Sequence, residues 1–503
     1  MHLDKAFSTL KRVNLNEIVS SGDIYFLSLL RVPVREDGFL TEKRFHSNVS
    51  LLPNIQLPIE DQFMKHVFYG IIALFLFVCS DFGQARPTAF LNARIIPIAG
   101  APIEQGILLV QNGKITAVGD ARTVRLSSDV DRIDLKGSVI MPGIVDSHSH
   151  IGEGSGGDAS NPIQPDVRLL DGINARAASI QRAQAGGITT VNVMPGSGHL
   201  DSGQTLYLKL RDNAAKIEDL LILDKDGKYM GGIKFANGTN SIRSGGGAFP
   251  GTRARSAALV REQFIKAQEY REKVRKAGDD KSKLPARDLA MEALVEVLDR
   301  KRVIHWHTHR HDDIMTVLRL QKESGFRVVL HHVSEGWKVA DEIAAAKIPT
   351  SVILIDSPGG KLETTDLKFE TPAILDKAGV LVGFHTDDGI TDSRWFLRTA
   401  GLAVRAGMPR EKALYGMTMA NAIILDLQDR IGSLEAGKDA DFIVLSGDPL
   451  SVYTHVMQTW VEGKKVFDRS DPKDHLIAVG GVGAGNDGEI EVDCFDGDLG
   501  GEN

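Results

Sequence analysis

The sequence has little cysteine and no excess of basic charge. Its two cysteines, Cys79 and Cys494, lie far apart in a chain of 503 residues, so neither a structural disulfide nor a cysteine-ligated zinc site is expected. The formal net charge is -7 at pH 7, which gives no positive field for phosphate groups and argues against a nucleic-acid partner. These absences favour a small-molecule or peptide substrate.

The N-terminal part also lacks an apolar run long enough to span a membrane. Residues 67–78 are apolar, whereas a membrane-spanning helix needs about 20 such residues. Residues 64–66 (Met-Lys-His) precede this run and residues 83–85 (Gly-Gln-Ala) follow it, an order that predicts a secretory signal peptide over residues 64–85. The protein is therefore expected to be exported, to a periplasm or as a secreted protein, without a stable membrane span. A membrane anchor is the alternative.

The ends of the chain are expected to lie outside the folded body. A cleavable signal acts only at the start of a chain, which makes Met64 the expected initiator. Residues 1–63 are then an N-terminal extension that is non-native or disordered. Residues 471–503 are rich in glycine and acidic residues and predict a solvated tail.

Two segments with short β-strand patterns flank the middle of the chain. Residues 86–141 include GILLVQNGKITAVGD, in which Asn-Gly is the signal for a tight hairpin. Residues 430–470 include FIVLSGDPL and VMQTWVEGKKVFD, which have the same β character. Together these flanks predict one small β-sandwich domain built from both sides of the middle segment.

Residues 142–429 alternate strand-like apolar runs with helical, alanine-rich segments. The runs include GITTVNVM, RVIHWHTH, FRVVLHHV and GVLVGFHT. Such alternation predicts parallel strands joined by crossover helices, and its length suits an α/β fold of the (β/α)8 TIM-like barrel type. A doubly wound open sheet is the alternative architecture.

The stretch MPGIVDSHSHIG places His148 and His150 directly after an apolar run. Side chains two residues apart on a strand share a face, and the carboxyl ends of barrel strands meet at one mouth. The pair is therefore a candidate clamp for a divalent metal ion. The alternative is a pair of histidines packed in a core or a loop.

Polar residues also close other apolar runs of the predicted barrel. A hydrophobic residue would pack better at each of these positions, whereas histidine, lysine and aspartate gathered at one mouth would make a metal site. The residues are Lys234, His307, His332 and Asp387.

The order of these motifs resembles that of the amidohydrolase superfamily over residues 87–470. The opening signature of the superfamily appears as PGIVDSHSH and its closing signature as GSLEAGKDADFIVLSGDP. The chain is most similar to the imidazolonepropionase-like and prolidase-like branch, through PGSGHLDSGQ, IKFANGTN and HHVSEGWK. The resemblance implies a metal-dependent hydrolase that cleaves the C–N bond of an amide.

The resemblance also implies a binuclear metal site. His148, His150 and Asp387 would bind the more buried ion, and His307 and His332 would bind the more exposed one. Zinc is the expected ion for this set of nitrogen and oxygen donors, and manganese, iron and cobalt suit the same donors.

In this resemblance Lys234 bridges both ions after carboxylation by CO2. An ammonium group repels cations, whereas a carbamate offers one anionic oxygen to each ion. The ions would share a hydroxide whose parent water has its pKa lowered towards about 7. That hydroxide would attack the substrate carbonyl, and Asp387 would take its proton and pass it to the leaving nitrogen. The substrate would be a small peptide, an N-acyl amino acid or a cyclic amide.

Some residues near the expected ligands have open assignments. His309 shares strand parity with His307, so it is an alternative ligand and otherwise a substrate-binding residue. His331 is expected on the face opposite to that of its neighbour in the chain. His385 would line the site, and Arg243 is a candidate for gripping a substrate carboxylate.

A mononuclear metal-dependent deaminase is the alternative activity. Within the superfamily, deaminases lack the bridging lysine and carry a glutamate three residues after the fifth-strand histidine. Here Lys234 is present and Arg310 lies three residues after His307; with His309 as the ligand, that position would be Asp312. A non-catalytic barrel that serves as a scaffold or binding protein is a further alternative, and a homo-oligomer is compatible with the sequence.

Overall fold

The computed structural model describes residues 86–152, 157–243, 247–355 and 361–480. The expected N-terminal extension, the expected signal peptide and most of the acidic tail lie outside these residues, as do both cysteines. Within the described ranges, no helix is both long and apolar enough to cross a membrane.

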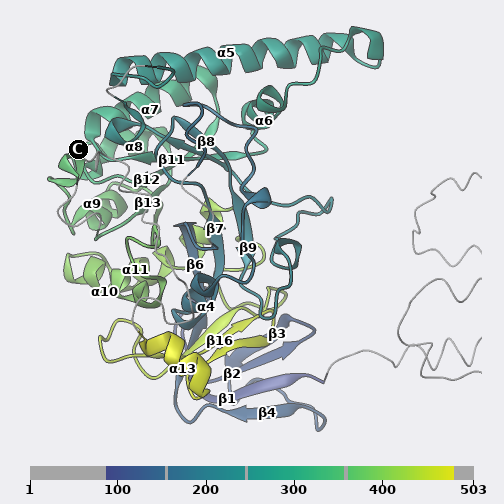
Figure 1. The fold of residues 1–503 in the computed structure, drawn as a ribbon. Helices are drawn as coiled ribbons and strands as arrows, with labels where there is room; N and C mark the ends of the chain where they lie inside the picture. Colours follow the sequence, from purple (N-terminus) through teal and green to yellow (C-terminus); the bar gives the residue numbers. More distant parts are fainter. Residues whose placement is uncertain (1–85, 153–156, 244–246, 356–360, 481–503) are drawn as a thin grey trace, which may run out of the picture. The chain divides into compact units, whose positions relative to one another are not determined.

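The two flanks of the chain form one eight-stranded sheet, drawn at the bottom of Figure 1. Its order is β17-β16-β15-β5-β1-β2-β3, with β4 paired to β1. The strands of the N-terminal flank are β1 (Thr88–Ile95), β2 (Ile103–Gln111), β3 (Lys114–Asp120), β4 (Asp131–Asp134) and β5 (Val139–Pro142). Those of the C-terminal flank are β15 (Phe442–Leu445), β16 (Val456–Val461) and β17 (Lys464–Asp468).

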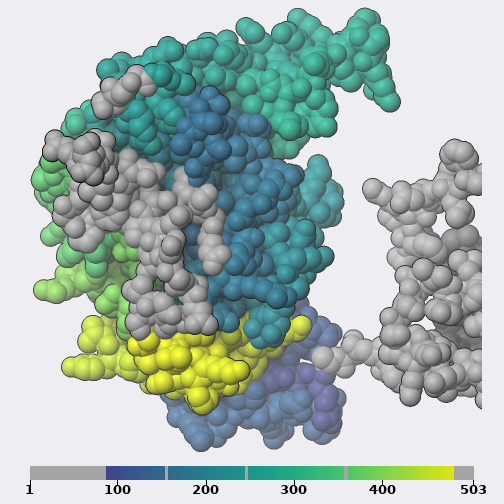
Figure 2. Space-filling model, in the orientation of Figure 1, coloured from purple at the N-terminus to yellow at the C-terminus, as the bar shows by residue number. Residues whose placement is uncertain are grey.

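The seam between the flanks lies at β5. This strand is parallel to β1 and antiparallel to β15, so that Ile140 is paired with both Ile95 and Val444. Phe90 of β1 packs edge-on against Phe442 of β15, with ring centroids 4.8 Å apart. Figure 2 shows the C-terminal strands and helix, in yellow, against the N-terminal strands in blue and purple. The sheet therefore joins segments that lie more than three hundred residues apart in the sequence.

Two tight turns connect the outer strands of this sheet. Asn112 and Gly113 connect β2 to β3, and Glu462 and Gly463 connect β16 to β17. All of them have positive φ, as a type I′ hairpin turn requires, and both strand pairs are antiparallel. The predicted Asn-Gly hairpin is confirmed.

The middle of the chain contributes two further sheets, of orders β14-β13-β12-β11-β10-β8 and β6-β7-β9. Neighbours from β10 to β14 are parallel, as are β6 and β7. The strands are β6 (Ile144–Ser149), β7 (Ile188–Val193), β8 (Asp201–Gln204), β9 (Leu206–Lys209), β10 (Ile233–Ala236), β11 (Val303–Thr308), β12 (Arg327–His332), β13 (Thr350–Val352) and β14 (Val382–Phe384).

Helices alternate with these strands, as the sequence predicts (Figure 1). α7 joins β11 to β12, α8 joins β12 to β13 and α9 joins β13 to β14, each a crossover between parallel strands. The helices are α4 (Ala178–Ala185), α5 (Arg253–Ala277), α6 (Leu289–Leu298), α7 (His311–Ser324), α8 (Ala340–Ala346), α9 (Thr371–Lys377), α10 (Leu397–Arg405), α11 (Arg410–Gly416), α12 (Met419–Ile424) and α13 (Pro472–Val479).

The strands β8 and β9 depart from the predicted parallel order. β8 is antiparallel to β10, and β9 is antiparallel to β7. Gly203 in β8 has φ 107° and lies so close to Val167 that a Cβ atom would be 2.4 Å from its carbonyl oxygen, so this approach requires glycine. Within the described residues, no strand pairing joins the sheet of β6 to the sheet of β14. A 2.9 Å hydrogen bond from Asp387 N to His148 O nevertheless links the ends of these two sheets. The fold is mixed α/β.

Candidate metal centre

The middle strands bring the expected metal ligands to one buried place. Each expected ligand lies within a strand or shortly after its carboxyl end. This is the region that forms the mouth of a barrel. All are fully buried apart from His150, whose side chain is 9% exposed. Their positions are His148 in β6, His150 just after it, Lys234 in β10, His307 in β11, His332 at the end of β12 and Asp387 shortly after β14.

Asp387 lies at the centre of this cluster. Its Oδ1 is 3.0 Å from Nε2 of His148 and 2.9 Å from Nε2 of His150. Its Oδ2 is 3.9 Å from Nε2 of His332. One atom from each of His148, His332 and Asp387 falls within 4.8 Å of the others, close enough for a single metal ion to bind all three.

Lys234 points its amine into the same place. Its Nζ lies 2.9 Å from Nε2 of His148 and 3.2 Å from Sδ of Met194, and its side chain is fully buried. A buried ammonium group beside histidines is costly, because burial favours the neutral form of lysine. The position therefore suits a lysine whose charge is removed or reversed by modification.

A second group of ligand atoms is formed by His307, His309 and His332, again within 4.8 Å of one another. Nδ1 of His307 is hydrogen-bonded to Oγ of Ser197 at 2.9 Å, and among the described residues its buried Nε2 has no hydrogen-bond partner. A ring that is oriented through one nitrogen presents the other to a metal ion. Nδ1 of His309 is hydrogen-bonded to Oγ of Ser334 at 2.8 Å. The donor set thus fits a divalent metal ion, with histidines from β11 and β12 at this second position.

His331 and His332 both face the interior, although consecutive residues of a strand usually point to opposite faces. Nε2 of His331 lies 3.0 Å from Nδ1 of His305, and its ring centroid is 5.0 Å from that of His148. The φ of His332 is 71°, which breaks the alternation at the end of β12. The prediction that His331 lies on the opposite face is therefore wrong.

Hydroxyl groups orient the histidines around the centre, and sequence reasoning missed them. The Tyr207 hydroxyl is 3.0 Å from Nε2 of His305, and Oγ of Ser351 is 2.8 Å from Nδ1 of His385. Ser197 lies in PGSGHLDSGQ, a stretch recognised only as part of a family pattern. Serine and tyrosine are common and follow no metal-ligand spacing, so only the contacts identify these residues.

Burial favours the neutral form of His148, His307 and His332. Desolvation, with the positive charge of Lys234, lowers the pKa of His148 well below its ordinary value. Desolvation, together with the neighbouring His332, also lowers the pKa of His307 well below its ordinary value. Desolvation lowers the pKa of His332 itself to about 3. Neutral imidazole is the form that binds metal ions, so the site needs no deprotonation of histidine at neutral pH.

Two buried aspartates, Asp387 and Asp146 of the opening motif, have pKa values shifted in opposite directions. Burial opposes ionisation of Asp387, but His148 and His332 overcome it and hold the pKa of Asp387 well below its usual range. Burial raises the pKa of Asp146 to about 8, although this carboxyl accepts hydrogen bonds from N and Oγ1 of Thr386 at 3.1 and 2.5 Å. Asp387 is therefore anionic and can serve as a metal ligand, and Asp146 ties the segment just after β14 to β6.

The two remaining candidates from the sequence differ in their surroundings. His385 stacks on His148 with ring centroids 4.8 Å apart, and both share a third ligand group with His331. The guanidinium of Arg243 instead donates to the carbonyl oxygens of Asn240 and Gly198, at 2.7 and 3.0 Å. Among the described residues, no hydrogen bond or ion pair joins Arg243 to an expected ligand.

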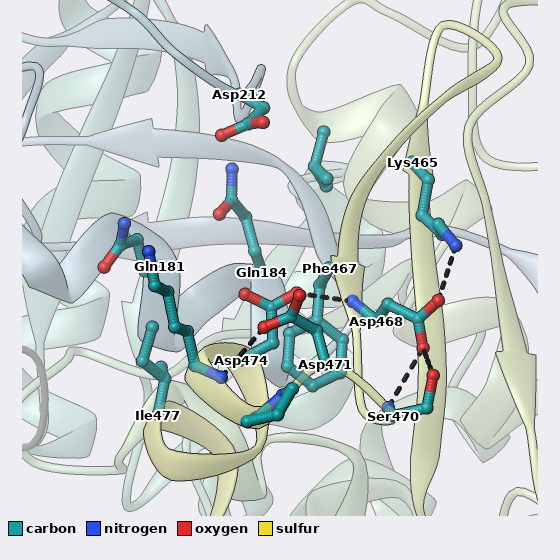
Figure 3. A pocket seen from close by; sticks show the side chains of 13 residues that line it. Gln181, Gln184, Asp212, Lys465, Phe467, Asp468, Ser470, Asp471, Asp474 and Ile477 are labelled. Carbon is teal, nitrogen blue, oxygen red and sulfur yellow. Dashed lines mark hydrogen bonds and ion pairs between the residues drawn. The ribbon is translucent and has the colours of Figure 1, made fainter.

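A separate pocket of about 590 Å³ lies between α4, β17 and α13 (Figure 3). Its acidic side chains have structural partners. Asp468 pairs with Lys465 at 2.5 Å, Asp471 caps α13 by accepting from Lys473 N, and Asp474 accepts from Asp468 N at 2.7 Å. The hydrogen bonds of these aspartates hold α13 against the flank sheet. No residue of the candidate centre lines this pocket.

Known proteins resemble this chain in sequence and in fold. The sequence profile of the amidohydrolase family matches residues 139–467. The crystal structure of an amidohydrolase from Thermotoga maritima MSB8 aligns with a TM-score of 0.70 and 35% identity, covering 76% of this chain and 100% of that one.

Two curated relatives are more distant. Amidohydrolase tasK of Hapsidospora irregularis is 26% identical over 77% of this chain, which spans only 44% of the length of tasK. Imidazolonepropionase of Fusobacterium nucleatum subsp. nucleatum is 21% identical over 72% of this chain and 92% of its own length.

Proposed function

Because this chain belongs to the amidohydrolase family, whose members are metal-dependent hydrolases of carbon–nitrogen bonds, we propose that it hydrolyses the amide bond of a small molecule. The substrate would be a small peptide, an N-acyl amino acid or a cyclic amide. The observation that carries the proposal is the convergence of Asp387 with histidines of β6 and β12, at 2.9 to 3.9 Å. Apolar side chains would pack this interior better than charged and polar ones, so packing alone does not explain the cluster.

Two divalent ions are proposed for this centre, zinc first, with manganese, iron or cobalt as other candidates. His148, His150 and Asp387 would hold one ion, and His307 and His332 the other. Two of the ligand groups, each within 4.8 Å, support neighbouring ions: one joins His148, His332 and Asp387, and the other joins His307, His309 and His332. His150 is added to the first ion because its Nε2 is 2.9 Å from Oδ1 of Asp387. When bound, the ions lower the pKa of water and polarise the substrate carbonyl.

Lys234 is proposed to carry a carbamate that offers one oxygen to each ion. Its complete burial and the 2.9 Å approach of its Nζ to His148 support this role. As an ammonium group, the same side chain would repel the ions that it faces.

Asp387 is proposed to move the proton during hydrolysis. Its Oδ1 is the oxygen nearest to His148 and His150, at 3.0 and 2.9 Å, whereas Oδ2 faces Nε2 of His332 at 3.9 Å. Oδ2 would accept a proton from the attacking water and return it to the leaving nitrogen, as general base and then general acid. The products are a carboxylic acid and an amine.

Deamination is less well supported by the surroundings of β11. Arg310 and Asp312, which occupy the positions of the proton-shuttling glutamate, pair with each other at 3.0 Å at the start of α7. Their side chains are 40% and 45% exposed, outside the buried histidine cluster. Because every ligand position is filled, a scaffold without activity is also disfavoured.

The direct experiment is reconstitution of the metal-free chain, beginning at Arg86, with zinc. It should then hydrolyse at least one member of a panel of dipeptides, N-acyl amino acids and cyclic amides, with one amine formed for each bond cleaved. Zinc-dependent release of ammonia from aminopurines or aminopyrimidines, without amide hydrolysis, would replace the proposal with the deaminase. Absence of turnover on every compound with the metal bound would support the scaffold.

The finer architecture and the destination of the chain are also proposals. We propose that residues 142–429 form a (β/α)8 barrel and that residues 86–141 and 430–470 form a β-sandwich domain, which the parallel ladders and the shared flank sheet support. Export through a signal peptide at residues 64–85 rests on the sequence pattern. N-terminal sequencing of the exported protein tests it, and recovery of a peptide from residues 1–63 in that protein would contradict it.

A further inference from the structure

A second pocket, separate from the candidate centre, lies among α10, the loop between β15 and β16, and α13. Its volume is about 400 Å³, within the range of pockets that hold small molecules. Most of its wall is apolar. Trp395, at the end of the short helix η9 (Ser393–Trp395), Leu402 of α10 and Leu450 of the loop all line it. None of the expected metal ligands is among the described residues of this wall.

Arginines supply positive charge around this apolar wall. Arg398 and Arg405 of α10 line the pocket, as does Arg469, just after β17, whereas no described aspartate or glutamate lines it. Arg394 lines it as well, but its guanidinium pairs with Asp392 at 2.5 Å. The pocket therefore combines an apolar interior with a positive charge that no acidic side chain of its own lining offsets.

Two of these arginines have no carboxylate partner within the described ranges. The guanidinium of Arg398 lies over the ring of Trp395, 4.9 Å from its centroid, and forms no ion pair there. Arg469 is partly buried, and its backbone N donates to O of Met457 at 2.8 Å. Its guanidinium has no hydrogen bond or ion pair, and burial lowers the pKa of Arg469 with no nearby carboxylate to oppose it. Charge that is partly withdrawn from water in this way is costly unless an anion approaches it.

The acidic side chains next to these segments in the sequence are already paired. Asp448 pairs with Arg410 at 2.6 Å, and Asp468 pairs with Lys465 at 2.5 Å. A second copy of this chain is a poor occupant, because a two-fold contact at the pocket would bring the same arginines together, and like charges repel. An apolar pocket with arginine at its wall instead complements a small molecule that has an apolar body and an anionic group. The planar fork of arginine suits a carboxylate, which accepts two parallel hydrogen bonds from it.

We propose that this pocket binds a monocarboxylate with an apolar body, either a short fatty acid or an arylalkanoate. Arg469 and Arg398 contact the carboxylate, and the apolar body packs against Trp395, Leu402 and Leu450. Because the pocket shares no residue with the candidate centre, the inference is independent of the proposed amide hydrolysis.

The test is the binding of 4-phenylbutyrate to the purified protein, measured by calorimetry and by tryptophan fluorescence. 4-Phenylbutanol has the same apolar body without the charge, and acetate has the charge without the body. Arg469→Met and Arg398→Met remove one charge each, and Arg469→Lys keeps it. Arg125→Met, at an exposed arginine of the loop after β3, is the matched control. Because the guanidinium of Arg469 has no partner in the described part of the chain, Arg469→Met is expected to fold as the wild-type protein does.

The wild-type protein should bind 4-phenylbutyrate with a change in fluorescence that Trp395→Phe removes. The alcohol should bind at least about tenfold more weakly, and Arg469→Met should weaken binding of the carboxylate by about tenfold to hundredfold, the usual effect of losing a hydrogen bond to a charged group. Arg398→Met, at a more exposed arginine, should weaken it by about fivefold, and Arg469→Lys should retain part of the affinity. The control should stay within about twofold of the wild-type value.

Three results would overturn the assignment. The first is equal affinity for the carboxylate and the alcohol, which means that the arginines do not contribute. The second is an affinity for the carboxylate that neither Arg469→Met nor Arg398→Met changes, as expected for binding at the metal centre alone. The third is a dimer that Trp395→Ala dissociates, with no binding of 4-phenylbutyrate at millimolar concentration, which would assign the pocket to a second copy of the chain.

Discussion

Replacing Asp387 by asparagine removes the charge at the centre of the cluster and keeps its shape. The carboxylate lies 3.0 and 2.9 Å from His148 and His150 and is fully buried, and an asparagine amide in its place cannot accept the proton. General acid–base catalysis contributes about 10² to 10⁴ in rate. This corresponds to about 3 to 5 kcal/mol of activation free energy at about 1.4 kcal/mol per factor of ten. We expect kcat for the best amide substrate to fall by at least about 100-fold.

The assay is steady-state amide hydrolysis, with bound zinc measured on the same samples by mass spectrometry. The matched control is Asp388→Asn at the next residue, whose carboxyl accepts a 2.8 Å hydrogen bond from N of Ser393 and whose pKa is raised by burial. An amide oxygen at this position can accept the same hydrogen bond from N of Ser393, so kcat of the control should change by less than about tenfold. Undiminished kcat in Asp387→Asn with zinc retained would refute the proton-transfer role.

Three further outcomes follow from contacts around the centre. Ser197→Ala frees the ring of His307 and should weaken zinc binding by about 10- to 100-fold in a chelator competition; unchanged affinity would show that the 2.9 Å contact does not position the ligand. Lys209→Met breaks a buried pair with Asp439, at 2.9 Å, and should lower the free energy of unfolding in urea by about 3 to 5 kcal/mol; a loss below about 1 kcal/mol would mean that the pair resembles an exposed one. The pKa of His305 and that of His332 are each about 3 in the folded chain because of burial, below the unfolded value of 6.5. The unfolded chain therefore binds more protons, so this stability is complete above pH 6.5 and is lost as the pH falls towards 3. Between pH 6.5 and 5 each group should lower the free energy of unfolding of the metal-free protein by roughly 2 kcal/mol, as measured by denaturant titration. A free energy of unfolding that does not change over this pH range would contradict the burial argument.

The strands that form the centre were predictable because local patterns encode them. Short apolar runs that end in histidine or aspartate give β11, β12 and the end of β14, and His148 and His150 follow a similar run. Turn chemistry is equally local, and the Asn-Gly hairpin of the flank sheet forms as expected. These features depend on neighbouring residues alone.

The features that could not be predicted depend on contacts between distant segments. The antiparallel course of β8 requires the close approach of Gly203 to Val167. His331 shares the interior face of His307, its register partner, and His332 joins it there because its own backbone has a positive φ, which no pattern in HHVSEGWK indicates.

The metal content of the purified chain tests the central claim most directly. Wild-type protein beginning at Arg86 and Lys234→Met are loaded with zinc, desalted and measured by inductively coupled plasma mass spectrometry. If Lys234 bridges two ions held by the adjacent ligand groups, as proposed, about two zinc ions are expected per wild-type chain and at most about one in the variant. Zinc-free wild-type protein, or equal zinc in both proteins, would contradict the binuclear centre.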